Sequence, residues 1–184
     1  MAKQCGFYFG TDRCIQCRTC EVACQSVHNI ETVIKWRKVI QHWVGEFSNI
    51  KTVVFSLACM HCGKPACEEA CSTGAISKRT EDGIVVVDKD KCTGCRDCYT
   101  ACPFDVPRFG VDGTMQKCDF CLGLGIEPSC VVHCPTGALQ YGTMERLPHV
   151  INGKVIERLS GPTEASIIIL HKSGTNMIQN FFGR

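Results

Sequence analysis

No stretch of this sequence is apolar for the roughly 20 residues needed to cross a bilayer, and the strongest late run, Ile167 to Leu170, is far shorter. Neither sign of charge is in excess, since 20 basic and 18 acidic residues are interspersed along the chain. Such a balance lacks the basic patch that nucleic-acid binding needs. A glycine-rich dinucleotide fingerprint and a metalloprotease motif are also missing, so catalysis by this chain alone has little support. We therefore expect no direct membrane insertion, no nucleic-acid partner and a non-catalytic role.

Export signals are missing from the first residues as well. Residues 1–9 contain neither an apolar core region nor a twin-arginine pair, so we expect no export signal of the chain's own. The 17 cysteines among 184 residues would indicate a disulfide scaffold in a short secreted chain. Without an export signal, and with an odd count, the cysteines favour metal-bound thiolates over disulfides.

Four quartets contain every cysteine except Cys5. Two of them have the spacing C-x2-C-x2-C-x3-C of bacterial ferredoxins: the first, Cys14, Cys17, Cys20 and Cys24, and the third, Cys92, Cys95, Cys98 and Cys102. The other two also begin with C-x2-C and end with C-x3-C: the second, Cys59, Cys62, Cys67 and Cys71, and the fourth, Cys118, Cys121, Cys130 and Cys134. The pattern predicts four 4Fe-4S clusters on sixteen cysteines.

An internal repeat extends beyond the cysteines. Residues 71–76 and 134–139 are near copies, as are residues 14–24 and 92–102, which indicates duplication of one small module. Between the second and third quartets, an Asp-Gly turn between two apolar stretches predicts a strand, a tight turn and a second strand. Within a quartet, three cysteines two residues apart can curl round one corner of a cubane. The fourth, three residues further into a helix, points away toward a second cluster.

Zinc is the main alternative to iron-sulfur. A zinc ribbon usually has two C-x2-C knuckles separated by a longer loop, and the fourth quartet taken alone is close to that pattern. The first and third quartets do not fit it. Because the repeat relates all four quartets, iron-sulfur is favoured for each of them.

Basic residues recur beside the cysteines. Arg13, Lys91 and Lys117 each precede the first cysteine of a quartet, and Arg18 and Arg96 each follow the second. A cation beside an anionic cluster favours the reduced form and so raises the reduction potential. The alternative, solvated loop residues kept by duplication, has equal weight.

Three further residues could bind metal or react. His61 and His133 lie next to cysteines, but with four cysteines for each cluster we expect neither to be an iron ligand. For Cys5 we expect a buried, apolar-type cysteine at the end of the first strand rather than a reactive thiol.

Residues 31–57 contain both tryptophans and fit helical periodicity in part, but we favour a hairpin that excludes water from the clusters, with a strand over residues 51–55. Residues 150–156 have the pattern of a hairpin with an Asn-Gly turn. The tail that follows, residues 166–184, either docks a partner or packs on its own domain.

The four-quartet layout resembles the iron-sulfur subunits of the dimethyl sulfoxide reductase group of molybdenum and tungsten oxidoreductases. The resemblance covers Gly6 through Gly142, and its most specific stretches are residues 13–24, 59–67, 83–88, 92–104 and 117–121. Two departures concern local geometry: Gln25 follows Cys24 and Ser72 follows Cys71, where the ferredoxin pattern has proline. Similar four-cluster subunits also accompany hydrogenases.

The resemblance implies how the quartets share clusters. The first would exchange its last cysteine with the fourth, and the second with the third. The implied ligand sets are Cys14, Cys17, Cys20 and Cys134; Cys118, Cys121, Cys130 and Cys24; Cys59, Cys62, Cys67 and Cys102; and Cys92, Cys95, Cys98 and Cys71.

Together these observations predict an α+β fold of duplicated bacterial-ferredoxin-like modules, built of short strands, cysteine loops and short helices, with a C-terminal extension. Residues 1–145 would form the four-cluster domain, with quartets 14–24 and 118–134 in one module and 59–71 and 92–102 in the other, and residues 146–184 the extension.

The hypothesis for function is an electron relay to or from the catalytic subunit of a molybdenum- or tungsten-pterin oxidoreductase. A further redox or membrane-anchor subunit would be a second partner. A free-standing polyferredoxin or a hydrogenase-associated carrier is the alternative. We expect a cytoplasmic location, with periplasmic export on a signal-bearing partner as the alternative.

Overall fold

The computed structural model describes residues 3–146, 155–158 and 162–171. Its strands are β1 (Cys5–Gly10), β2 (Lys38–Val44), β3 (Lys51–Leu57), β4 (Ile76–Lys78), β5 (Val85–Val87), β6 (Arg108–Phe109), β7 (Met115–Gln116), β8 (Leu139–Thr143), β9 (Val155–Arg158) and β10 (Ile167–His171). Its α-helices are α1 (Thr19–Val27), α2 (Ala66–Glu69), α3 (Asp97–Ala101) and α4 (Ser129–Val132), and the 3-10 helices are η1 (Lys89–Lys91) and η2 (Leu122–Leu124).

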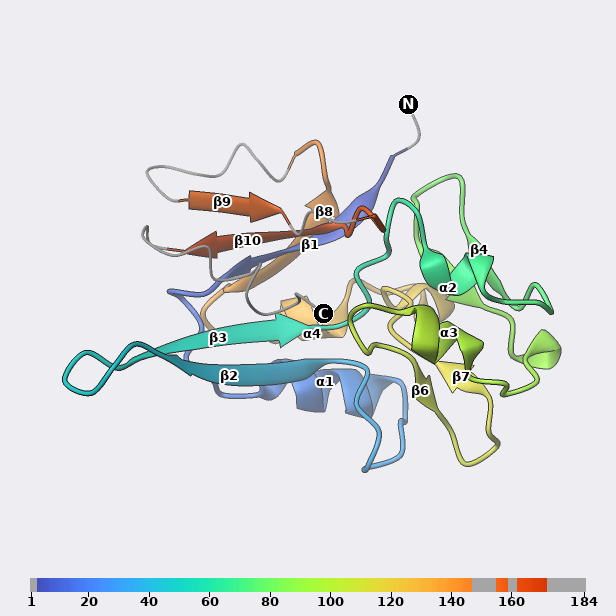
Figure 1. The fold of residues 1–184 in the computed structure, drawn as a ribbon, viewed down its shortest axis with the longest axis horizontal. Coiled ribbons are helices and arrows are strands. Elements are labelled where there is room, and N and C mark those ends of the chain that lie inside the picture. Colours follow the sequence, from blue (N-terminus) through green and yellow to red (C-terminus); the bar gives the residue numbers. More distant parts are fainter. Residues whose placement is uncertain (1–2, 147–154, 159–161, 172–184) are drawn as a thin grey trace.

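Two units of the same construction make up most of the fold. In one, β1 pairs antiparallel with β8 and helix α1 packs against α4. In the other, β4 pairs antiparallel with β5 and helix α2 packs against α3. Figure 1 shows α2, α3 and β4 gathered at the right, away from the strands β9 and β10. This duplicated combination of short strands and short helices confirms the predicted α+β, ferredoxin-like fold, and the predicted strand, turn and strand between the second and third quartets.

The last described strand is part of the larger sheet. The strand order is β8-β1-β10-β9, and β10 runs parallel to β1, with Phe7 opposite Ile167 and Phe9 opposite Ile169. Ile167, Ile168 and Ile169 are at most 1% exposed, so this stretch of the predicted extension contributes a central strand. The predicted Asn-Gly hairpin at 150–156 lies largely outside the described residues, and partner docking by the extension stays a prediction.

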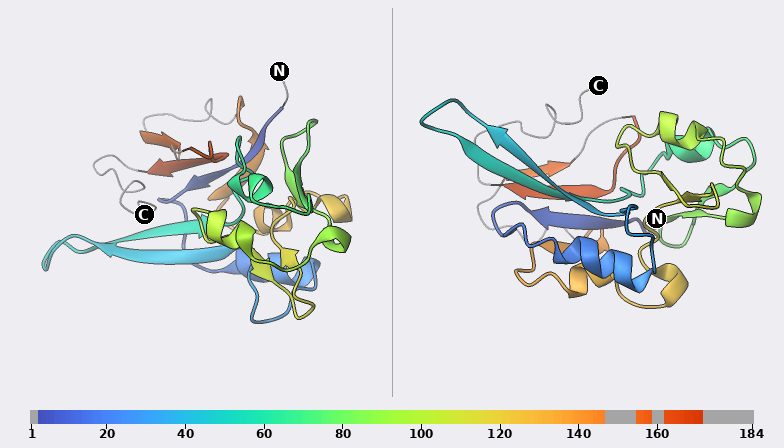
Figure 2. Two further views of the ribbon diagram at one scale, coloured as in Figure 1. Left: turned by 45° about the vertical axis from the view of Figure 1, so that its right-hand side comes forward. Right: turned by 90° about the horizontal axis from the view of Figure 1, so that it is seen from below.

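A long hairpin, β2 with β3, extends from the rest of the structure (Figure 2). The pairing runs from Lys38 opposite Leu57 to Val44 opposite Lys51, which confirms the hairpin and the strand predicted within residues 31–57. Its base is buried at Phe55 and Leu57, whereas Phe47 near its tip is 94% exposed. The base of the hairpin therefore contributes to the core and the tip does not.

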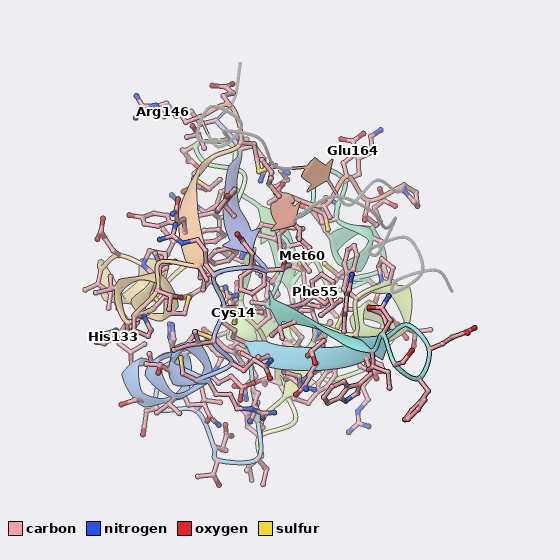
Figure 3. The ribbon with its side chains drawn as sticks, turned by 90° about the vertical axis from the view of Figure 1, so that its left-hand side faces the viewer. Cys14, Phe55, Met60, His133, Arg146 and Glu164 are labelled. Atoms are coloured by element: carbon pink, nitrogen blue, oxygen red, sulfur yellow. The ribbon has the colours of Figure 1, made fainter. Side chains whose placement is uncertain are left out.

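The main core lies between the sheet, the hairpin base and the cysteine loops. Phe55 and Met60 point into it together with Cys14, whereas His133, Arg146 and Glu164 lie at the periphery (Figure 3). Phe7 of β1 stacks on Phe120, with ring centroids 4.3 Å apart and planes 8° from parallel. Because Phe120 lies inside the fourth quartet, the core and the cysteine loops form one packed unit.

Cys5 differs in place from the prediction. It begins β1 rather than ending it, and it is half-buried rather than buried. Burial raises the pKa of its thiol, assisted by the nearby carboxylate of Asp82, so the thiol is protonated at neutral pH and weakly nucleophilic.

Candidate functional site

All four quartets begin with a loop of the same backbone geometry. The residue just before the second cysteine has a positive φ in each: 61° at Gln16, 45° at His61, 71° at Gly94 and 60° at Phe120. Left-handed residues in such loops turn successive N–H groups to one side and create anion-binding concavities. The structure thus extends the sequence repeat to the backbone, and the loops suit an anionic group.

Three small cavities are each lined by four cysteines. Each has a volume of about 20 Å³. The cysteines that line them are Cys14, Cys17, Cys20 and Cys134 in the first; Cys59, Cys62, Cys67 and Cys102 in the second; and Cys71, Cys92, Cys95 and Cys98 in the third. The near-equal volumes and the identical cysteine count indicate three equivalent sites.

A fourth set is buried more deeply. Cys24, Cys118, Cys121 and Cys130 are all buried. Cys118 interacts electrostatically with Cys130 and Cys24, and Cys24 with Cys130 and Cys121. Every one of the four sets thus takes three cysteines from one quartet and the last from another, and the groups match those that the resemblance implied.

The sets differ in exposure. Two contain an exposed cysteine, Cys17 in one and Cys95 in the other. We call these two the outer sets: Cys14, Cys17, Cys20 and Cys134, and Cys71, Cys92, Cys95 and Cys98. The inner sets, which contain no exposed cysteine, are Cys59, Cys62, Cys67 and Cys102, and Cys24, Cys118, Cys121 and Cys130.

Most of the thiols have raised pKa values because they are buried. Burial raises the pKa of Cys24 and of Cys67 to about 12, and that of Cys62 and of Cys98 to about 11. Neighbouring thiols contribute to each of these shifts. The thiolate form therefore requires a compensating positive charge, which bound iron would supply. Loading the sites is expected to release protons.

Two cysteines have the opposite shift. Burial opposes ionisation of Cys71 and Cys134, but hydrogen bonds from a threonine side chain and from backbone N–H groups of the residues that follow outweigh it. Their pKa values are therefore below the usual range. These cysteines begin the near-identical stretches 71–76 and 134–139, so the repeat has a direct chemical meaning: its N–H groups stabilise the last thiolate of a quartet.

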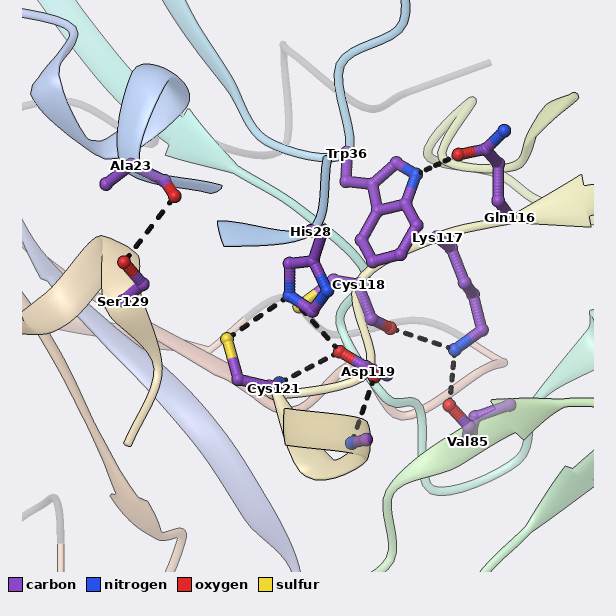
Figure 4. Close-up of polar contacts among 11 residues, drawn as sticks. Ala23, His28, Trp36, Val85, Gln116, Lys117, Cys118, Asp119, Cys121 and Ser129 are labelled. Atoms are coloured by element: carbon purple, nitrogen blue, oxygen red, sulfur yellow. Dashed lines mark hydrogen bonds and ion pairs between the residues drawn. The ribbon is translucent and has the colours of Figure 1, made fainter. Parts of the chain in front are cut away.

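The predicted cations separate into two kinds. Arg13, Arg18, Lys91 and Arg96 are exposed, which favours the solvated alternative for these four. Lys117 is 4% exposed; its Nζ donates to the carbonyl oxygens of Val85 and Cys118, and its side chain lines the cavity of Cys59, Cys62, Cys67 and Cys102 (Figure 4). Lys117 is thus a buried cation beside an inner set.

Sequence patterns missed two residues beside the inner cysteines. His28 Nε2 lies 3.3 Å from Cys121 Sγ and 3.6 Å from Asp119 Oδ1 (Figure 4). Arg37 is buried, 2% exposed, and its charge interacts with Cys118 and Cys130. Neither belongs to a motif, and no sequence signal distinguishes Arg37 from a solvated arginine.

The two histidines that the sequence singled out differ from each other. His61 is fully buried, and its Nδ1 accepts a hydrogen bond from the Val85 N–H at 3.0 Å. Burial holds its pKa well below the usual range, so it is neutral. His133 is exposed, with Nδ1 2.8 Å from the Ser129 carbonyl oxygen. Neither lines one of the three cysteine cavities.

The cysteine geometry suits a bulky cluster. Three of the four cysteine sets surround cavities, and each quartet has a loop shaped for an anion. This arrangement fits 4Fe-4S clusters better than the tetrahedral zinc site, whose sulfur ligands lie about 2.3 Å from one ion. All 17 cysteines are free of disulfides.

Comparison with known proteins agrees with this chemistry. The 4Fe-4S dicluster domain family matches residues 50–144. Two proteins of Escherichia coli strain K12, the probable anaerobic dimethyl sulfoxide reductase component YnfG and the B subunit of anaerobic dimethyl sulfoxide reductase, are each 38% identical over 159 residues, covering 80% of this chain and 77% of theirs. The formate dehydrogenase iron-sulfur subunit of Wolinella succinogenes is 34% identical over 181 residues, covering 84% of this chain and 89% of its own.

The chain therefore belongs to the 4Fe-4S dicluster family that includes the iron-sulfur chains of anaerobic dimethyl sulfoxide reductases. The predicted resemblance is confirmed. As for the membrane, none of the helices in the described residues is long and apolar enough to span it.

Proposed function

We propose that this chain is an electron-transfer subunit that holds four 4Fe-4S clusters and serves the catalytic subunit of a molybdenum- or tungsten-pterin oxidoreductase. The observation that carries the proposal is the gathering of sixteen cysteines into four sets, three of which surround cavities of nearly equal size. When bound, 4Fe-4S clusters take up and release single electrons. The named role of related chains, as parts of dimethyl sulfoxide reductase and formate dehydrogenase, supports the partner.

Each residue type has a part in this function. The sixteen cysteines of the inner and outer sets would ligate iron. The loops around Gln16, His61, Gly94 and Phe120 would direct N–H groups toward the anionic clusters. The core around Phe7 and Phe120 would exclude water from the inner sets.

The exchange of last cysteines also suggests an order for the relay. Cys20 and Cys24 lie on one helix, α1, but belong to an outer and an inner set. In the other unit, Cys98 lies on α3 and Cys102 directly follows it, and these two again belong to an outer and an inner set. Lys117 lines one inner cavity and directly precedes Cys118 of the other inner set. An outer, inner, inner, outer order follows, with the exposed outer sets as the points of electron entry and exit.

Anaerobic purification of the chain with its co-expressed partner tests the proposal. We expect about sixteen irons and as many acid-labile sulfides per chain, together with a large subunit that contains pterin and molybdenum or tungsten and stays bound through a salt wash. Cys5→Ser is the matched control: it removes the cysteine outside the four sets and should retain all the iron. Far fewer irons, or stoichiometric zinc, would refute the clusters. A fully loaded chain that elutes alone would favour a free polyferredoxin.

A further inference from the structure

Arg37 is a buried cation with no carboxylate partner among the residues that the structure describes. Its side chain is 2% exposed, and it belongs to none of the ion pairs found between described residues. Burying a charge is unfavourable unless it is paired and hydrogen-bonded. The polypeptide thus leaves a strong requirement for negative charge near this guanidinium.

The contacts that Arg37 makes with the polypeptide meet only part of this requirement for negative charge. Nη1 donates to the carbonyl oxygen and the hydroxyl oxygen of Ser56, at 3.1 and 3.3 Å. The guanidinium carbon lies 4.3 Å from the centre of the Phe7 ring. Nη2 is buried and has no hydrogen-bond partner among the described residues, so part of the fork is left for something that the polypeptide does not provide.

The surroundings of the guanidinium belong to two different cysteine sets. On one side, Ser56 Oγ lies 3.4 Å from Sγ of Cys20, a member of an outer set. On the other, the Arg37 charge acts on Cys24, Cys118 and Cys130 of an inner set. One fixed charge therefore serves two neighbouring sets.

We propose that Arg37 is a shared positioning residue that sets the reduction potentials of two clusters, those held by Cys14, Cys17, Cys20 and Cys134 and by Cys24, Cys118, Cys121 and Cys130. This inference rests on the proposed function. Each cluster becomes more negative on reduction, and a buried cation is weakly screened, so it favours the reduced form and raises the potential. Because the charge is shared, removing it lowers two potentials and not one.

The test is an anaerobic redox titration of the whole complex, followed by electron paramagnetic resonance, in wild-type protein and three variants. In Arg37→Gln, we expect two of the four midpoints to fall, each by at least a tenfold change in the reduction equilibrium, which is about 59 mV for one electron. Arg37→Lys keeps the charge and should restore both midpoints most of the way. Arg18→Gln removes an exposed cation that lines the same outer cavity, and should shift the reduction equilibrium less than twofold because solvent screens it.

Iron analysis separates the ways in which the test can fail. A wild-type count far below about sixteen irons overturns the proposed function and this inference with it. A full count in Arg37→Gln with unmoved midpoints, or with one midpoint moved, overturns the shared role of Arg37 alone. Equal shifts in Arg37→Gln and Arg18→Gln would also overturn it, since a general charge effect would then explain both.

A measurement without substitution of Arg37 covers the case in which neither Arg37 variant retains iron. Protein with ¹⁵N in its arginine guanidinium groups, prepared with Arg13, Arg18 and Arg96 all changed to Gln to remove the exposed arginines beside the outer sets, is reduced and examined by pulsed electron paramagnetic resonance. Nitrogen coupling to two of the reduced signals supports the shared position. Coupling to one or none overturns it.

Discussion

The inner and outer cysteine sets share ligand type and loop geometry but differ in what surrounds them. The outer sets have an exposed cysteine, Cys17 or Cys95, followed by an exposed arginine, Arg18 or Arg96. The inner sets have no exposed cysteine, and the cations beside them, Arg37 and Lys117, are buried. One duplicated motif has thus been placed in two environments, one open to partners and solvent and one enclosed.

Because of this difference, clusters with identical ligands can have unequal reduction potentials. In water a charge is screened within about 10 Å at ordinary ionic strength, whereas a buried charge acts through a lower effective dielectric. Both inner sites, and the one outer site that shares Arg37, would therefore be controlled in part by fixed buried charges of the chain. The exposed side of each outer site would also respond to solvent or to a docked protein.

Replacing one inner ligand and its outer counterpart should give the largest effect. Cys118→Ser leaves a hydroxyl in the core where a metal-bound sulfur is expected, and a buried hydroxyl without a partner costs about 1–3 kcal/mol. We expect one cluster to be lost and the melting temperature of anaerobic protein to fall by about 2–12 °C more than in Cys17→Ser, at about 2–4 °C per kcal/mol. Iron analysis and calorimetry measure the two effects.

Cys17→Ser is the matched substitution, since the new hydroxyl can be solvated there. It should reduce the iron content at one site but leave the melting temperature close to that of the loaded protein. Equal destabilisation by the two variants would show that exposure does not separate the inner from the outer sets.

The sequence predicted the local structure well, because ferredoxin-type spacing depends on residues close together in the chain. Quartet membership, the Asp-Gly hairpin before Ile84 and the β2–β3 hairpin all depend on residues close together in the chain, and the structure has these features. The role of the near copies that begin at Cys71 and Cys134 is also local, because the N–H groups that stabilise each thiolate belong to the residues directly after it.

Burial was the part that the sequence did not predict. Arg37 lies between Trp36 and Lys38 with no motif around it, and only the long-range packing of Phe7 and Ser56 encloses it. Lys117 and Lys91 occupy the same position before a quartet, yet one is buried and the other exposed. The place of β10 beside β1 joins opposite ends of the sequence. All three features depend on tertiary contacts that no local pattern records.

Comparing Lys117→Met with Lys91→Met tests the difference between a buried and an exposed lysine before a quartet. We expect a smaller effect on stability than that of Cys118→Ser. Methionine at 117 leaves the buried carbonyl oxygens of Val85 and Cys118 without their donor, at a cost of about 1–3 kcal/mol. It also removes a charge that favours ionisation of Cys67, so one midpoint should fall. Lys91→Met, at an exposed position, should change the free energy of unfolding by no more than about 0.5 kcal/mol. Chemical denaturation and redox titration compare the variants, and the same loss in both would remove the distinction between buried and exposed cations.

Arg96→Gln should have the smallest effect, and salt should remove it. The Arg96 guanidinium lies 5.2 Å from the centre of the Phe109 ring and beside the outer cavity of Cys71, Cys92, Cys95 and Cys98, but its side chain is exposed. Its charge is therefore screened, and the screening length falls from about 10 Å at 0.1 M salt to about 3 Å at 1 M. Voltammetry of the variant at low salt should show one midpoint slightly lowered, and in 1 M salt variant and wild type should coincide. A shift that survives high salt would place Arg96 among the buried cations and would make the outer set electrostatically equivalent to the inner ones.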